Sequence, residues 1–123
     1  MNRWQAMRQA NIVYGTRELD NGDTRFANIS KGPKKVWRID IPLSKISTGG
    51  LEDINLLLCN GSNKLHHLRV PSKYFRQNRT RLVVHPKRNC IGLELSADEP
   101  NMFQDVRRGG GSVKFARFWQ RRF

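Results

Sequence analysis

A chain of 123 residues is of ordinary size for one domain and can bury a single hydrophobic core. Its 23 Lys and Arg against 10 Asp and Glu give a formal charge of +13 at pH 7, which favours a polyanionic partner. No apolar run approaches the roughly 20 residues of a membrane helix, and the first residues lack the apolar core of a secretory signal, so we expect a cytoplasmic protein that does not enter a membrane.

The N-terminal third is predicted to hold one helix and one clear strand. The first fourteen residues can form a short helix that ends at Gly15. Residues 16–33 are polar and rich in turn signals, and the polar N-terminal region 1–33 as a whole is compatible with flexibility. Residues 36–43 then alternate apolar and polar side chains, which is the period of a half-buried strand.

The middle of the chain predicts two hairpins with a helix between them. Residues 54–59 are almost continuously apolar, as expected of a strand covered on both faces, and 65–70 return as its partner. Pro71 precedes a short helix for which Ser72 is the expected N-cap. The second hairpin consists of strands 81–85 and 90–96.

The last part of the chain is predicted to be mainly helical. A short helix is expected from about residue 98 to 106, and Gly109–Ser112 is expected to act as a glycine-rich hinge. For residues 112–123 the spacing of the aromatic side chains favours a helix over a strand. The whole chain, 1–123, is thus predicted to be a single α+β domain. It has a mainly antiparallel sheet of about five strands and short helices at the N-terminus, after Pro71 and near the C-terminus.

Positive charge is concentrated in one stretch of the chain. No acidic residue lies between Asp53 and Glu94, and residues 61–90 carry eight cations. Crowded like charges disfavour the compact state unless an anion offsets them. Because Lys and Arg bind backbone phosphates, this stretch predicts a nucleic-acid-binding face centred on residues 64–88, for DNA and RNA alike. Its cations are Lys64, Arg69, Lys73, Arg76, Arg79, Arg81, Lys87 and Arg88.

Three further residues extend the predicted face. The ring of Tyr74 could stack on an unpaired base. Arg107 and Arg108 precede three consecutive glycines, whose backbone N–H groups could meet a phosphate. The same glycines are equally typical of a linker.

A nuclease is the second function that the sequence allows. A histidine near an arginine could serve as acid and base without a metal, through His67 or His85. A magnesium-dependent nuclease would instead need carboxylates close in space, for which Asp20 and Asp23 are the candidates. Scattered histidines and acidic turns are also ordinary features of non-catalytic proteins. We therefore assign no catalytic residue, no metal ligand and no cofactor, with Mg²⁺ implied only by the nuclease alternative.

Three runs of sequence resemble the later strands of the restriction-endonuclease-like nucleases, which are named for the PD-(D/E)xK motif. The runs are 37–42 (WRIDIP), 53–58 (DINLLL) and 68–72 (LRVPS), and the resemblance covers about residues 25–78. It implies a nuclease-type fold that binds DNA. The family's catalytic acids would fall within residues 25–31, which contain no Asp or Glu. The resemblance therefore implies an inactive or divergent relative, a DNA-binding part, or a subunit that needs another chain.

A third alternative is a basic interaction protein that binds an acidic protein partner. The aromatic side chains near the C-terminus could pack against another chain, and a homodimer formed there would double the basic surface. These side chains are Phe115, Phe118, Trp119 and Phe123.

Overall fold

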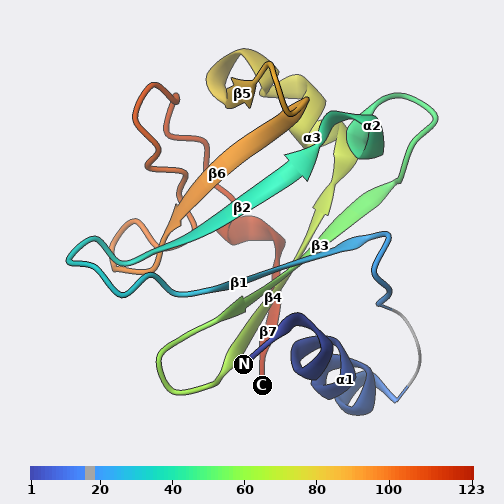
Figure 1. The fold of residues 1–123 in the computed structure, drawn as a ribbon, viewed down its shortest axis with the longest axis vertical. Helices are drawn as coiled ribbons and strands as arrows, with labels where there is room; N and C mark the ends of the chain where they lie inside the picture. Colours follow the sequence, from blue (N-terminus) through green and yellow to red (C-terminus); the bar gives the residue numbers. More distant parts are fainter. Residues whose placement is uncertain (16–18) are drawn as a thin grey trace.

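The computed structural model describes residues 1–15 and 19–123, so residues 16–18 of the predicted turn-rich region lie outside it. Over these ranges the chain is an α+β protein, as predicted, and its strands form two β-sheets where one sheet was expected (Figure 1). The four-stranded sheet has the order β1-β3-β4-β7, with β1 (Thr24–Asn28), β3 (Asp53–Cys59), β4 (Leu65–Pro71) and β7 (Trp119–Arg122). The three-stranded sheet has the order β2-β6-β5, with β2 (Val36–Pro42), β6 (Cys90–Ser96) and β5 (Val83–His85).

Within the described ranges three α-helices accompany these sheets: α1 (Arg3–Tyr14) covers one face of the four-stranded sheet, and the shorter α2 (Leu43–Ile46) and α3 (Ser72–Gln77) follow strands β2 and β4. In addition, 3₁₀ turns occupy Arg79–Arg81 and Ala116–Phe118. All the strand pairs within the sheets are antiparallel except β1 with β3, which is parallel. This confirms the predicted mainly antiparallel architecture, with seven strands in the described residues where about five were expected.

Strand β3 is covered on both faces, as its apolar sequence predicts. Ile54, Leu56 and Leu58 belong to the core between the two sheets. The alternate residues Leu57 and Cys59 belong to a second core under α1. The layers are therefore α1, the four-stranded sheet and the three-stranded sheet, and an apolar cluster lies at each interface.

Helix α1 is fixed at both ends by local sequence. The side chain of Asn2 accepts a hydrogen bond from the backbone N–H of Gln5, and the Gln5 side chain accepts one from the backbone N–H of Asn2. Gly15 ends the helix in the left-handed region, with φ of +72°. The buried side of the helix presents Ala6, Met7 and Ala10 to the four-stranded sheet. The predicted N-terminal helix and its stop at Gly15 are thus confirmed.

Trp37 joins the two sheets. Its side chain is fully buried, stacks on Phe103 at a centroid separation of 5.6 Å, and donates from Nε1 to the backbone oxygen of Cys59 at 2.9 Å. An isolated bridge between Trp37 and Ile29 also links β2 to the segment after β1. Beyond this bridge no ladder of hydrogen bonds joins the described residues of β1 to β2.

The predicted strands 36–43, 54–59, 65–70 and 90–96 are confirmed, and so are both hairpins. Two strands were not predicted. Strand β1 lies in the region expected to be polar loop, and β7 lies in the expected C-terminal helix. In the latter segment only Ala116–Phe118 is helical, as a single 3₁₀ turn, because residues 119–122 pair with β4 instead.

Two local predictions were wrong. Residues 98–106 form turns and isolated bridges instead of a helix, because Asp105 pairs with Leu95 and Gln104 with Lys114. Ser72 does not cap α3: it is the first helical residue, Pro71 takes the N-cap position, and the buried Ser72 hydroxyl has no hydrogen-bond partner.

Candidate nucleic-acid interface

Helices α2 and α3 pack against each other at the end of the molecule where β5 also lies (Figure 1). Several of the predicted cations belong to α3 and to the turns that follow α3 and β5. Two contacts made by α2 hold this end together. The backbone N–H of Leu43 donates to the oxygen of Asn89 in the turn after β5, at 2.9 Å. Arg76 Nη1 donates to the backbone oxygen of Ile46 at 2.6 Å. We call this surface the basic end, and its cations are Lys45, Lys73, Arg76, Arg79, Lys87 and Arg88.

The basic end holds more cations than it can neutralise with its own acids. Lys73, Arg79 and Lys87 have exposed side chains and form no ion pair with a described residue. Arg88 is paired with Asp40 at 3.0 Å, and both side chains are well exposed. Two more acids lie next to α3: Glu52 directly before β3, and Asp53 as the first residue of β3. The net charge of the surface is positive, as a phosphate-binding face requires.

The structure does not bring the whole predicted face together. Lys64 lies in the turn before β4 and Lys73 in the helix after it, so the seven residues of β4 separate them by about 23 Å. Arg69 lies on the face of β4 that α1 covers, and its Nε donates to Asn55 Oδ1 at 3.3 Å. Neither residue belongs to the basic end.

Tyr74 uses its ring within the protein. The ring is half-buried and packs edge-on against Phe115 and Phe118, with centroid separations of 5.5 and 4.7 Å. The hydroxyl donates to the backbone oxygen of Lys114. The guanidinium of Arg117 lies 4.7 Å from the ring centroid, in the position that a stacked base would need.

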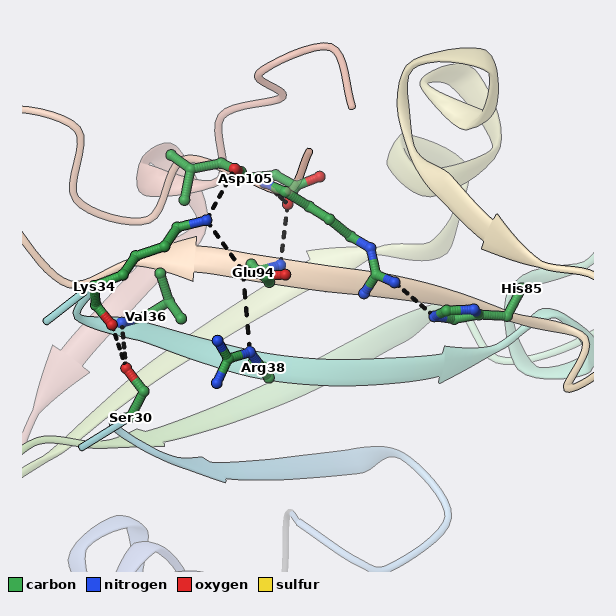
Figure 2. A network of polar contacts seen from close by, with 9 residues as sticks. Ser30, Lys34, Val36, Arg38, His85, Glu94 and Asp105 are labelled. Atoms are coloured by element: carbon green, nitrogen blue, oxygen red, sulfur yellow. Dashed lines mark hydrogen bonds and ion pairs between the residues drawn. The ribbon is translucent and has the colours of Figure 1, made fainter. Parts of the chain in front are cut away.

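Arg107 packs over Gly92 on the outer face of the three-stranded sheet and reaches the ring of His85, which Figure 2 labels. It donates from Nη2 to His85 Nε2 at 2.8 Å, which makes Nε2 the acceptor in this contact. Gly92 provides the space, because a Cβ there would come within 2.5 Å of Arg107 Nη1. Buried Asp105 accepts hydrogen bonds from the backbone N–H groups of Glu94 and Arg107, and its burial raises the pKa of its carboxyl.

The glycine segment after Arg108 packs against Arg81. Arg81 Nη2 donates to the backbone oxygen of Gly111 at 2.7 Å, and the N–H of Gly111 donates back to the oxygen of Arg81. The N–H of Gly110 donates to the backbone oxygen of Arg107. These amides therefore bind protein carbonyls, and Arg108 is the exposed cation of this segment.

His67 is buried in a polar network that holds α1 on the sheet. Its Nδ1 forms a hydrogen bond with the hydroxyl of Tyr14, and its Nε2 forms one with Asn55 Oδ1 at 2.8 Å. Burial, with a smaller effect of Arg69, lowers the pKa of His67 to about 4. His66 is also buried, and burial lowers its pKa. His67 has both ring nitrogens occupied and does not reach the surface, so it cannot act on a substrate in this conformation.

The candidate magnesium ligands form a turn. Asp20 Oδ1 accepts hydrogen bonds from the backbone of Gly22 and Asp23, and Asp23 Oδ1 accepts from Thr24 Oγ1 at 2.7 Å. These bonds shape the entry to β1. Within residues 1–15 and 19–123, no three His, Cys, Asp or Glu side chains are grouped closely enough to hold a metal ion.

Comparisons of the chain with protein-family models, with curated proteins and with solved structures gave no match. In the part of the chain that the structure describes, no helix is long and apolar enough to cross a membrane.

Proposed function

We propose that this protein binds nucleic acid through phosphate contacts at the basic end. The observation that carries the proposal is that separate segments of the chain supply exposed cations to one surface without supplying matching acids. Lys73, Arg79 and Lys87 come from α3, the following 3₁₀ turn and the turn after β5. Such crowding opposes folding of the free protein, and binding a polyanion relieves it.

Phosphate contacts of this kind give affinity without sequence preference. Each neutralised phosphate releases counterions, so log K falls linearly with log salt concentration, with a slope of about −0.9 per contact on duplex DNA. The proposal assigns no catalytic step to the protein. The proposal therefore predicts that the slope of log K against log salt concentration depends on particular cations.

The test compares two variants of equal net charge. The first carries Lys73→Gln, Arg79→Gln and Lys87→Gln. The control carries Lys31→Gln, Lys35→Gln and Lys64→Gln, which are exposed cations in the connections before β2 and β4, at the opposite end of the molecule. Each variant loses three of the +13 formal charges.

Binding to labelled oligonucleotides is measured by fluorescence anisotropy over a series of salt concentrations. The first variant is expected to reduce the magnitude of the slope on duplex DNA by about 2.7, and the control to leave it unchanged. An equal loss in both variants would show that net charge alone, and not the basic end, determines binding.

The same assay separates binding from cleavage. Single- and double-stranded DNA and RNA are incubated with Mg²⁺ or with EDTA and then run on denaturing gels. Intact oligonucleotides in both conditions are expected. Cleavage that EDTA abolishes would favour a magnesium-dependent nuclease, and no binding at low salt to any of the four would favour an acidic protein partner.

A further inference from the structure

A second cationic surface lies between β1, β2 and the start of α1. Figure 1 shows β1 and β2 spreading apart from the loop that connects them. Between Thr24–Phe26 on one strand and Arg38–Asp40 on the other lies an open groove of about 500 Å³. This volume is within the range of about 300–1,000 Å³ that small-molecule sites occupy.

Arginines from three elements line the groove: Arg3 from α1, Arg25 from β1 and Arg38 from β2. Arg3 and Arg25 form no ion pair with a described residue, and Arg38 lies 4.0 Å from Glu94. The acid in the groove, Asp40, is paired with Arg88. The groove therefore keeps a net positive charge after its own ion pairs are formed.

Trp4 lies at the same groove and is 68% exposed. The packing of α1 on the sheet does not require a tryptophan at position 4, because the helix contacts the sheet through Ala6, Met7 and Ala10. An exposed indole beside arginines is the combination that single-stranded nucleic-acid sites use, with the ring as a stacking platform and the cations on the backbone.

We propose that this groove binds an unpaired nucleotide of a single-stranded nucleic acid. The base stacks on the indole of Trp4, and Arg25 and Arg38 bind the neighbouring phosphates. The inference rests on the proposed function and specifies the kind of strand that is bound. Apart from its two ends, a duplex presents no free base face to Trp4, because its bases are stacked on one another inside the helix. Trp4 therefore discriminates single strands from duplexes, while the basic end binds both.

The first test compares Trp4→Ala with Ile12→Ala. Ile12 lies on the same helix and is 69% exposed, but it does not line the groove. Trp4→Ala is expected to weaken binding of an oligo-dT or oligo-U strand about 5- to 150-fold and to leave duplex affinity unchanged. Trp4→Phe is expected to recover part of the loss. Equal single-strand affinities for the Trp4→Ala and Ile12→Ala variants would overturn the inference.

The second test concerns the phosphates. Arg25→Gln with Arg38→Gln is expected to reduce the salt slope on single strands by about 1.4, which is two contacts at about 0.7 each. The matched control, Lys31→Gln with Lys35→Gln, removes the same charge from residues that do not line the groove and is expected to leave the slope unchanged. Equal slopes in the two variants would remove the arginines from the site.

The third test detects stacking directly. In a Trp119→Phe background the remaining tryptophans are Trp4, which is exposed, and Trp37, which is fully buried. An oligonucleotide is expected to quench the Trp4 emission, and an abasic strand of the same length is expected to bind without quenching it. Equal quenching by both strands would exclude base stacking.

The two proposals fail in different ways. If the unmodified protein binds no nucleic acid at low salt, the proposed function itself is wrong. If it binds with the expected salt slope but Trp4→Ala has no effect, only the groove is excluded. If Trp4→Ala changes the sedimentation of the free protein instead, the groove is a contact between protein chains, and the inference is overturned.

Discussion

The His67 network predicts that acid destabilises the fold in a defined pH range. His67 is fully buried, and its pKa is lowered to about 4 from the ordinary value of 6.5. As the pH falls below 6.5 the unfolded chain binds a proton at this position, whereas the folded protein binds one only near pH 4. Between these values the unfolded state holds more protons, so stability rises with pH and is lost as the pH falls.

The size of the effect follows from the two pKa values. Each unit of difference corresponds to about 1.4 kcal/mol, so the full loss between neutral pH and pH 4 is about 3 kcal/mol. Between pH 7 and pH 5 the expected loss is about 2 kcal/mol, a large part of the stability of an ordinary domain. Asp105 acts in the opposite direction: its raised pKa means that its burial costs stability when it is ionised and that this cost falls as the pH falls.

The measurement is urea denaturation at pH 7 and pH 5 for the unmodified protein and for His67→Gln. The substitution also removes packing, so the informative quantity is the change in unfolding free energy between the two pH values. This difference cancels the contribution of Asp105, which both proteins share. The variant is expected to lose about 2 kcal/mol less than the unmodified protein. Equal losses would refute the assignment of acid sensitivity to His67.

Two further predictions concern the attachment of α1. Leu57→Ala leaves a cavity under α1, where Leu57 is fully buried, and is expected to cost about 2–5 kcal/mol in the free energy of unfolding, measured by urea denaturation. A cost below about 1 kcal/mol would mean that the helix does not pack on β3. Asn2→Ala removes one half of the capping box and is expected to cost about 1 kcal/mol, with a matching loss of helical circular dichroism on heating. Unchanged melting would show that the cap does not stabilise the helix.

Elements with a strong local signal could be predicted from the sequence. The alternation in β2 and the continuous apolar run in β3 follow directly from which faces are buried. Strand β1 gave no such signal, because its five residues, TRFAN, do not alternate and its pairing with β3 is parallel and distant in sequence. Residues 115–119 fit helix and strand almost equally in aromatic spacing, and pairing of β7 with β4 decides the outcome.

The candidate sites were only partly predictable, because charge clustered in sequence is not charge clustered in space. Strand β4 lies within the basic stretch of the sequence and runs the full length of the sheet, so Lys64 and Lys73 lie at opposite ends of it. The groove shows the converse. Arg3, Arg25 and Arg38 are spread over 36 residues and form no local cluster, and the packing of α1 and β1 brings them together. The sequence feature that could have indicated the groove is Trp4, a large aromatic residue on the polar side of the N-terminal helix.

Strand β7 is an edge of the four-stranded sheet, and all four of its residues are exposed. Such an edge can pair with the edge of another molecule, and natural proteins prevent this with short strands and charged side chains. Arg121 and Arg122 carry such charge on β7, and we expect the repulsion between copies to keep these edges apart. A polyanion that coats the protein would cancel the repulsion. Molecules gathered on one strand would then be close together with their edges no longer kept apart by charge, and binding and self-association would be linked through the same arginines.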